Sequence, residues 1–229
     1  MAQVGHAPLK PRAAKKAMPA GIGRPAPLSG RQDTREPDED RMEHADPATL
    51  AFLRRRRSHP PKLLTGPAPS REALADLLEL AARVPDHGKL EPWRFVVLGR
   101  DALDRLAPVL AEHVLARSGD EAAAEKARSA FGSPVIVAVV SAPVASPKVP
   151  EWEQFLSAGA VCLELVNAAL AAGYGAAWLT GPAAEPEFAR PHLGIGEGER
   201  IVGLVHIGQR GPTPPERPRP DVAAKTTFL

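Results

Sequence analysis

One stretch in the second half of the 229-residue chain, Ser157 to Ala172, constrains its fold most strongly. Its only charged residue is Glu164. A helix made of these residues is apolar around almost its whole circumference, and such a helix is stable only when other protein surface covers it. We therefore expect it to lie in a hydrophobic core or against a second subunit. The chain is 44% hydrophobic, which is enough for a core of that size.

Helices and strands are expected in mixed order around this stretch. Apolar spacing of three and four residues predicts helices from Pro47 to about Arg57, from the cap Ser70 to Ala82, and from Leu103 to Val114. Short apolar runs bounded by proline or glycine predict strands at 95–98, 135–140, 176–179 and 201–207. The strand at 135–140 is apolar on both faces, which indicates a central place in a sheet.

Proline and charge set both ends of the chain apart from this core. Of the 26 prolines, seven lie between Pro8 and Pro47 and five between Pro212 and Pro220. We predict one domain at 46–211, a disordered Pro/Arg-rich extension at 1–45 and an extended tail at 212–229. The first 31 residues carry six Lys or Arg and no acid. A targeting peptide or a nucleic-acid tail remain alternative interpretations of that extension.

Composition argues against several functional classes. The formal net charge is only +2, which disfavours a general nucleic-acid binder. Cys162 is the only cysteine, so the chain has neither an internal disulfide nor a thiolate metal cluster, and the seven histidines lack metal-ligand spacing. We expect no metal. No apolar run reaches the ~18 residues needed to cross a bilayer. The sequence therefore predicts a cytoplasmic protein without a membrane contact.

Two basic motifs could bind an anion. Arg56, Arg57 and Ser58 follow the first predicted helix, where guanidinium groups and a hydroxyl could hold a phosphate. A solvated basic face is the alternative, because four successive arginines point in different directions on a helix. Arg83 and His87 flank a proline, and that corner could present both side chains to a ligand or simply end a helix. Known nucleotide and hydrolase motifs are absent from the sequence.

The order of short motifs along the chain resembles that of the nitroreductase family, and within it the compact bacterial YdjA-like branch. The resemblance runs from about Leu50 to Gly208. The motifs are Arg56-Arg57-Ser58, Ala82 to His87, Pro92-Trp93, Lys126-Ala127-Arg128, Lys148-Val149-Pro150, Trp152-Glu153-Gln154, Ser157-Ala158-Gly159, Gly173-Tyr174-Gly175, Trp178 with Thr180-Gly181, and Ile201-Val202-Gly203. Pro92-Trp93 alone would indicate core packing.

The resemblance implies an α+β three-layer sandwich with a mixed central β-sheet flanked by helices, built as an intertwined homodimer with FMN at the subunit interfaces. By the same resemblance, Arg56, Arg57 and Ser58 bind FMN, and Arg83 and His87 reach it from the partner subunit. Trp178, Leu179 and Thr180 match a later FMN-binding triplet, in which close relatives often carry arginine instead of Leu179. The stretch Ala168, Ala169, Leu170, Ala171, Ala172 and Gly173 matches one associated with the nicotinamide cofactor.

The implied activity is that of a flavin-dependent NAD(P)H oxidoreductase. NADH or NADPH reduces the flavin, the oxidised nicotinamide leaves, and a nitroaromatic, quinone or related small acceptor then enters the same cleft in a ping-pong cycle. No catalytic side chain is assigned, because the cofactor carries the chemistry. Two alternatives remain open: flavin chemistry on a different physiological substrate, and a nucleic-acid-binding module that uses the basic N-terminus and the arginine run.

Overall fold

The computed structural model describes residues 45–229. The chain divides into two units, Met1–Asp46 and Pro47–Leu229, and everything below concerns the second. Apart from its last residue, the predicted N-terminal extension lies outside the described residues.

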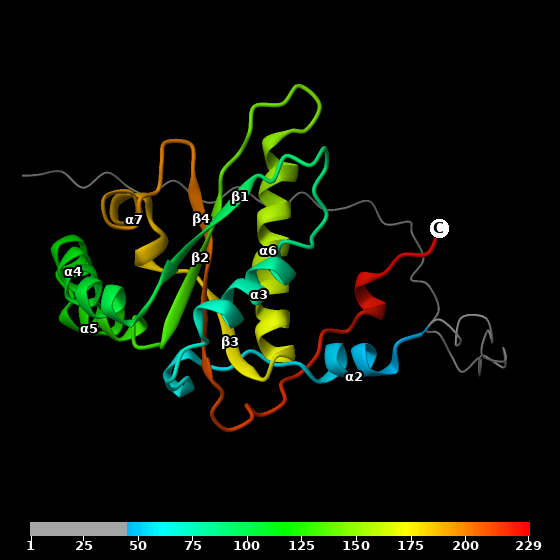
Figure 1. Cartoon of the computed structure of the whole chain (residues 1–229), viewed down its shortest axis with the longest axis horizontal. Coiled ribbons are helices and arrows are strands. Elements are labelled where there is room, and N and C mark those ends of the chain that lie inside the picture. Colours follow the sequence, from blue (N-terminus) through cyan, green and yellow to red (C-terminus); the bar gives the residue numbers. More distant parts are fainter. Residues whose placement is uncertain (1–44) are drawn as a thin grey trace, which may run out of the picture. The chain divides into compact units, whose positions relative to one another are not determined.

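Four strands form the sheet of this unit, in the order β1-β2-β4-β3 (Figure 1). They are β1 (Trp93–Leu98), β2 (Val135–Ser141), β3 (Tyr174–Leu179) and β4 (Arg200–Gln209). All three neighbouring pairs are antiparallel, so the predicted mixed sheet is wrong for the described residues. The reason is the position of β4. The strands β2 and β3 run in the same direction, but β4 lies between them and pairs antiparallel with each.

Helices cover both faces of the sheet, as the predicted three-layer sandwich requires (Figure 1). One face carries α4 (Arg100–Ser118), α5 (Glu121–Ala130) and α7 (Pro186–Leu193), and the other carries α3 (Arg71–Ala81) and α6 (Glu151–Ala171). Every residue of β2 is buried, because its alternate side chains enter the two separate cores. The sequence-based prediction that this strand is central is therefore correct.

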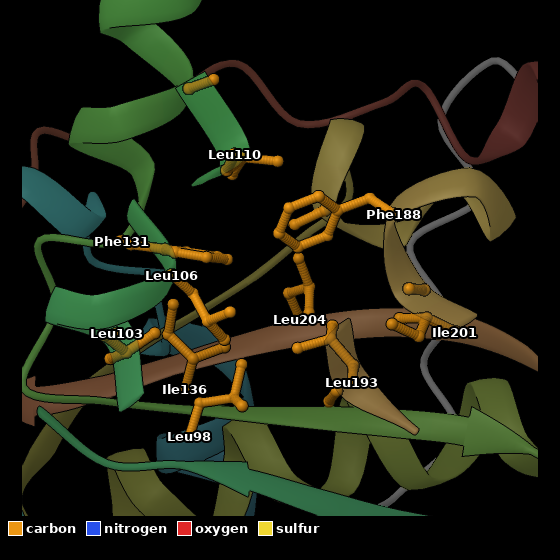
Figure 2. Packing of buried hydrophobic residues seen from close by; sticks show 14 of the residues in the cluster. Leu98, Leu103, Leu106, Leu110, Phe131, Ile136, Phe188, Leu193, Ile201 and Leu204 are labelled. Atoms are coloured by element: carbon orange, nitrogen blue, oxygen red, sulfur yellow. The ribbon is translucent and has the colours of Figure 1, made fainter. Parts of the chain in front are cut away.

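The first core lies between the sheet and α4, α5 and α7. Figure 2 shows its leucines packed around Phe131 and Phe188, whose ring centroids are 6.5 Å apart. Two caps fix the helices that supply it: Gly119 ends α4 in the left-handed conformation, and the Asp120 side chain accepts hydrogen bonds from the first amides of α5.

The helix α6 dominates the second core. It packs against α3 and against strands β2, β3 and β4. It begins at Glu151, six residues before the predicted apolar stretch, because Pro150 and the acidic residues Glu151 and Glu153 suit a helix N-terminus. By length and composition it is the one described helix that could cross a membrane, although Glu151, Glu153 and Glu164 interrupt its apolar residues. More than half of that window is buried in the fold, as expected of a core helix.

The remaining segments surround the sheet. The helix α2 (Pro47–Arg55) contributes no buried residue. Short 3-10 turns occur at Pro61–Leu63, Pro182–Ala184 and Ala223–Lys225. Residues 212–229 form no strand, and the tail contacts the body where the Arg57 guanidinium donates to the Pro215 carbonyl and lies 3.5 Å from Glu216.

Candidate functional site

Four arginines gather at one pocket of about 350 Å³, which we call the arginine pocket. The pocket lies where the end of α2, the end of α6 and the start of the C-terminal tail meet. Its lining residues are Phe52, Arg55, Arg56, Arg57, His59, Leu170, Ala171, Gly173, Arg210, Thr213 and Pro214. None of these lining residues is acidic. The arrangement is suited to a multiply charged anion such as a phosphate.

The arginine pocket unites several residues that were predicted from different parts of the sequence. Arg56 and Arg57 line it together with three residues of the stretch assigned to the nicotinamide. Ala168 and Ala169 are instead buried in the second core, and Ala172 is exposed outside the pocket. Ser58 is exposed and lies outside the lining. Only part of each predicted motif therefore faces this pocket.

His59 and Arg210 are pocket residues that sequence reasoning missed. The amide of His59 donates to the carbonyl of Ala176 (2.9 Å), so the chain after α2 runs beside β3. The side chain is only 6% exposed, and its Nδ1 has no hydrogen-bond partner in the described part of the chain. Burial lowers the pKa of His59, and the positive charge of Arg210 lowers it further. The nearby backbone of Arg57 acts in the opposite direction, although it makes no hydrogen bond to Nδ1.

A second pocket, of about 340 Å³, contains His87 and lies at the other end of α6; we call it the histidine pocket. His87 Nδ1 is 2.8 Å from Glu153 Oε2. The corner is held by Asp86, whose carboxylate accepts from the amides of Leu90 (3.2 Å) and Glu91 (2.8 Å). Arg83 is exposed beside this corner and does not line the pocket.

A third pocket, of about 390 Å³, lies at the far end of β3 against α4 and α5, and we call it the apolar pocket. Leu179 and Thr180 line it, as predicted for one ligand site, together with leucine, valine and alanine side chains of the helices. Lys126 is its only basic side chain apart from His206. His206 is buried, its Nδ1 lies 2.9 Å from Ser133 Oγ, and burial lowers its pKa to about 4.

The predicted triplet Trp178, Leu179 and Thr180 does not act as one unit. Successive strand residues point to opposite faces, so Leu179 faces the apolar pocket while Trp178 faces α6. The indole Nε1 donates to the Val202 carbonyl (3.3 Å). The ring packs over Gly203, where an added Cβ would lie 2.1 Å from that nitrogen. Trp93 is likewise a packing residue, since it lies in the second core and donates to Ser157 Oγ (3.3 Å).

The positions of the pockets along α6 and β3 show how far apart the three pockets lie. Leu156 lines the histidine pocket and Leu170 lines the arginine pocket. At 1.5 Å per residue these two positions are roughly 21 Å apart along α6. The arginine pocket and the apolar pocket instead lie at the two ends of β3, connected by the segment 56–61. By the same measure, at about 3.3 Å per residue, Gly173 of the arginine pocket and Leu179 of the apolar pocket are roughly 20 Å apart along β3. What distinguishes this pair is the segment 56–61, which lines both pockets and has no residue in the histidine pocket.

No group of three or more His, Cys, Asp or Glu side chains in residues 45–229 is arranged to hold a metal ion. Cys162 is a buried free thiol whose pKa is raised to about 12 by burial. A thiol that holds its proton so strongly is a packing residue rather than a nucleophile.

Comparison with known proteins gives consistent matches. A family model described as "Nitroreductase family" matches residues 53–209. The protein named "Putative NAD(P)H nitroreductase YdjA" of Escherichia coli (strain K12) is 37% identical over 146 residues, which are 63% of this chain and 80% of that protein. A similarly named protein of Haemophilus influenzae is 37% identical over 162 residues, or 69% of this chain and 86% of that one.

Solved structures agree with the fold. A nitroreductase-like family protein from Bacillus cereus has a TM-score of 0.65 at 22% identity, covering 81% of this chain and 97% of that chain. A nitroreductase with bound FMN from Bacteroides fragilis has a TM-score of 0.61 at 20% identity, covering 79% and 97%. At these identities the likeness establishes the fold alone.

Proposed function

Because the chain belongs to the nitroreductase family, we propose that it is an FMN-dependent oxidoreductase that passes hydride from NADH or NADPH to a small acceptor. Nitroaromatics, quinones and related electron-poor compounds are the acceptor class. The relatives named as NAD(P)H nitroreductases support the reductant, and the FMN bound in a structural neighbour supports the cofactor.

The observation that carries this proposal is the pairing of an arginine pocket with an apolar pocket at the two ends of β3. FMN has a phosphate at one end and a flat ring system at the other. Arg56, Arg57 and Arg210 would hold the phosphate, since a doubly charged anion needs fixed cationic donors. The apolar pocket would take the ring, with Leu179 against it and Lys126 near its polar edge.

The residues present also fit FMN because the lining of the arginine pocket has positive charges and no acidic side chain to offset them. The arginine pocket carries several cationic groups with no carboxylate in its lining, and the same lining includes His59, whose buried Nδ1 has no partner among residues 45–229. Concentrated positive charge of this kind is stable only when an anion or solvent offsets it. FMN would supply the hydride-accepting centre, while the chain would hold its phosphate, orient its ring and offset negative charge through Lys126.

A second subunit would complete the site. Within one chain, His87 lies beside the N-terminal end of α6, and the arginine pocket lies at its C-terminal end. In a two-fold homodimer with antiparallel α6 helices, however, the N-terminal end of one α6 meets the C-terminal end of the other. Trp152, Leu156 and Leu163 support this pairing, because they form an exposed apolar stripe on α6 at helical spacing. His87 of one subunit would then approach the FMN held by its partner.

Spectroscopy of the purified protein tests the proposed function. Flavin-loaded protein should show a flavin absorption band that either NADH or NADPH bleaches without oxygen, and adding a quinone or nitroaromatic should restore it. Comparing the bleaching rates with the two reductants identifies the preferred nicotinamide. Protein that takes up neither FMN nor riboflavin would contradict the proposal. Salt-sensitive DNA binding that is lost with residues 1–41 would favour the nucleic-acid alternative instead.

A further inference from the structure

The arginine pocket contains a buried histidine, His59, to which the proposed function assigns no contact with the ligand. His59 is only 6% exposed, lines the pocket, and has an Nδ1 without a hydrogen-bond partner among residues 45–229. Leaving a buried polar atom unpartnered costs about 1–3 kcal/mol, so folded proteins rarely do so without cause. An anionic ligand that binds beside this imidazole could change its charge.

The groups that face His59 decide its charge before a ligand arrives. The segment at the end of α2 supplies Arg55, Arg56 and Arg57, and the residue after β4 supplies Arg210. The end of α6 and the tail contribute only uncharged lining residues, Leu170, Ala171, Gly173, Thr213 and Pro214. Glu216 pairs with Arg57 at 3.5 Å but does not line the pocket. Burial, and after it the positive charge of Arg210, lower the pKa of His59 below its ordinary value, so it is neutral at neutral pH.

We propose that His59 is a proton-linked ligand for phosphate: when a phosphomonoester dianion enters the arginine pocket, His59 binds one proton and donates a hydrogen bond from its imidazole ring to a phosphate oxygen. This inference rests on the proposed function, with the FMN phosphate as the phosphomonoester. The proton comes from solvent, the phosphate keeps its two negative charges, and no covalent bond changes. Burial and the charge of Arg210 disfavour the protonated imidazole in the free protein, and the two negative charges of the bound dianion favour it.

The proposal fixes the direction of the pH dependence. The second pKa of a phosphomonoester is about 6, so free FMN is mainly a dianion above neutral pH. There, binding requires one proton from solvent as long as the pH stays below the pKa of His59 in the complex. Affinity for FMN should therefore fall by up to about tenfold per pH unit in this range. Riboflavin has the same ring but no phosphate, so its binding should take up no proton.

Titration calorimetry on the unaltered protein, freed of flavin, tests this directly. FMN is titrated at slightly alkaline pH in two phosphate-free buffers that differ in ionisation enthalpy. The difference in heat gives the number of protons taken up, which should be close to one for FMN and zero for riboflavin. Zero uptake with FMN would overturn the proposal.

A matched pair of variants assigns the proton. His59→Gln should abolish the uptake and the pH dependence, and should weaken FMN about tenfold at neutral pH while leaving riboflavin binding unchanged. His113→Gln is the control, because His113 on α4 also has a buried nitrogen without a partner in the described chain but does not line the arginine pocket. It should keep full proton uptake. Uptake that persists in folded His59→Gln protein would overturn the assignment.

The failure of this inference can be told apart from the failure of the proposed function. If neither flavin binds the unaltered protein, the proposed function is wrong. Inorganic phosphate is then the remaining probe. One proton taken up with phosphate, and lost in His59→Gln, would still support the role of His59, whereas binding without uptake would exclude it.

Discussion

Arg56 and Arg57 are neighbours in sequence but differ in their electrostatic surroundings. The Arg57 guanidinium already interacts with the Pro215 carbonyl and with Glu216. No ion pair is recorded for Arg56 within the described residues, so its charge is available to a ligand. The two arginines of the motif should therefore contribute unequally to phosphate binding.

We predict that Arg56→Ala weakens FMN binding by about 1.5–3 kcal/mol, the size of a hydrogen bond to a charged group. Arg57→Ala should weaken it less, because Glu216 already offsets part of that charge. Fluorescence titration of flavin into the flavin-free protein measures both effects. Arg54→Ala is the control, since Arg54 is an exposed residue of α2 that does not line the pocket. An Arg56→Ala protein with unchanged affinity would place the phosphate elsewhere.

How far the sequence predicts the site depends on whether its signals are local. Arg56 and Arg57 could be found because adjacent basic residues beside a helix end form a visible motif. Arg210 could not be assigned to the same pocket, because it lies more than 150 residues away and only the fold brings it there. Strand periodicity could have separated Trp178 from Leu179, since neighbouring strand residues point to opposite faces. The roles of all the site residues, Arg56 and Arg57 included, remain predictions.

Between elements, one ion pair connects β1 to the loop before β4. Arg94 Nε and Nη2 donate to the two Glu199 carboxylate oxygens at 2.7 and 2.6 Å, and the Gly196 amide donates to the same carboxylate at 2.7 Å. The hydrogen bonds from Arg94 lower the pKa of Glu199 to about 2, against the opposing effect of burial. The folded-state pKa is therefore below the ordinary value.

Because the pKa of Glu199 is lowered in the folded state, we predict that the folded protein loses stability as the pH falls. The contribution of Glu199 is fully present above its ordinary pKa of 4.5 and is lost as the pH falls toward 2. We expect Glu199→Gln to lower the free energy of unfolding at neutral pH by about 1–2 kcal/mol, because the partly exposed pair is screened by solvent. Urea unfolding measures the free energy of unfolding at neutral pH and at about pH 3. Between these two pH values it should fall less in the variant than in the natural protein.

The neighbouring carboxylate provides the control for that measurement. Glu197 is exposed in the same loop, so Glu197→Gln should keep the acid sensitivity of the natural protein. Equal acid sensitivity in Glu199→Gln would contradict the assigned role of the ion pair.

The elements that were predicted and those that were missed differ in the strength of their apolar pattern. The strand β2 and the helices α3 and α6 were found because leucine, valine and isoleucine repeat at the right spacing. The helices α5 and α7 were not predicted, because α5 is built mainly on alanine and α7 is short and contains Pro191. Gly119 with Asp120 before α5, and Gly194 after α7, are boundary signals that could have identified both. The place of β4 within the sheet depends on long-range pairing that no local pattern encodes.

At the scale of the whole molecule, the apolar stripe on α6 is the part of this helix that the core of one chain leaves uncovered. Trp152, Leu156 and Leu163 remain 63%, 61% and 47% exposed in the single chain. The sequence offered a core or a second subunit as the environment of this helix, and the structure buries one side of it in the core. A second copy on the other side would cover the remaining apolar surface and bring the histidine pocket to the arginine pocket.

We predict that Leu163→Arg yields a folded monomer that has lost most of its affinity for FMN. Leu163 is exposed in the single chain and lines none of the three pockets, so a charge there should oppose only the contact between copies. Sedimentation velocity should show the natural protein as a dimer and the variant at half its mass. Flavin titration should show at least a tenfold loss of affinity for FMN, because Arg83 and His87 can no longer reach the FMN of a partner.

Leu115→Arg, on α4 and similarly exposed, should remain a dimer with normal affinity for FMN. A monomeric variant that binds FMN normally would mean that one chain holds the cofactor alone.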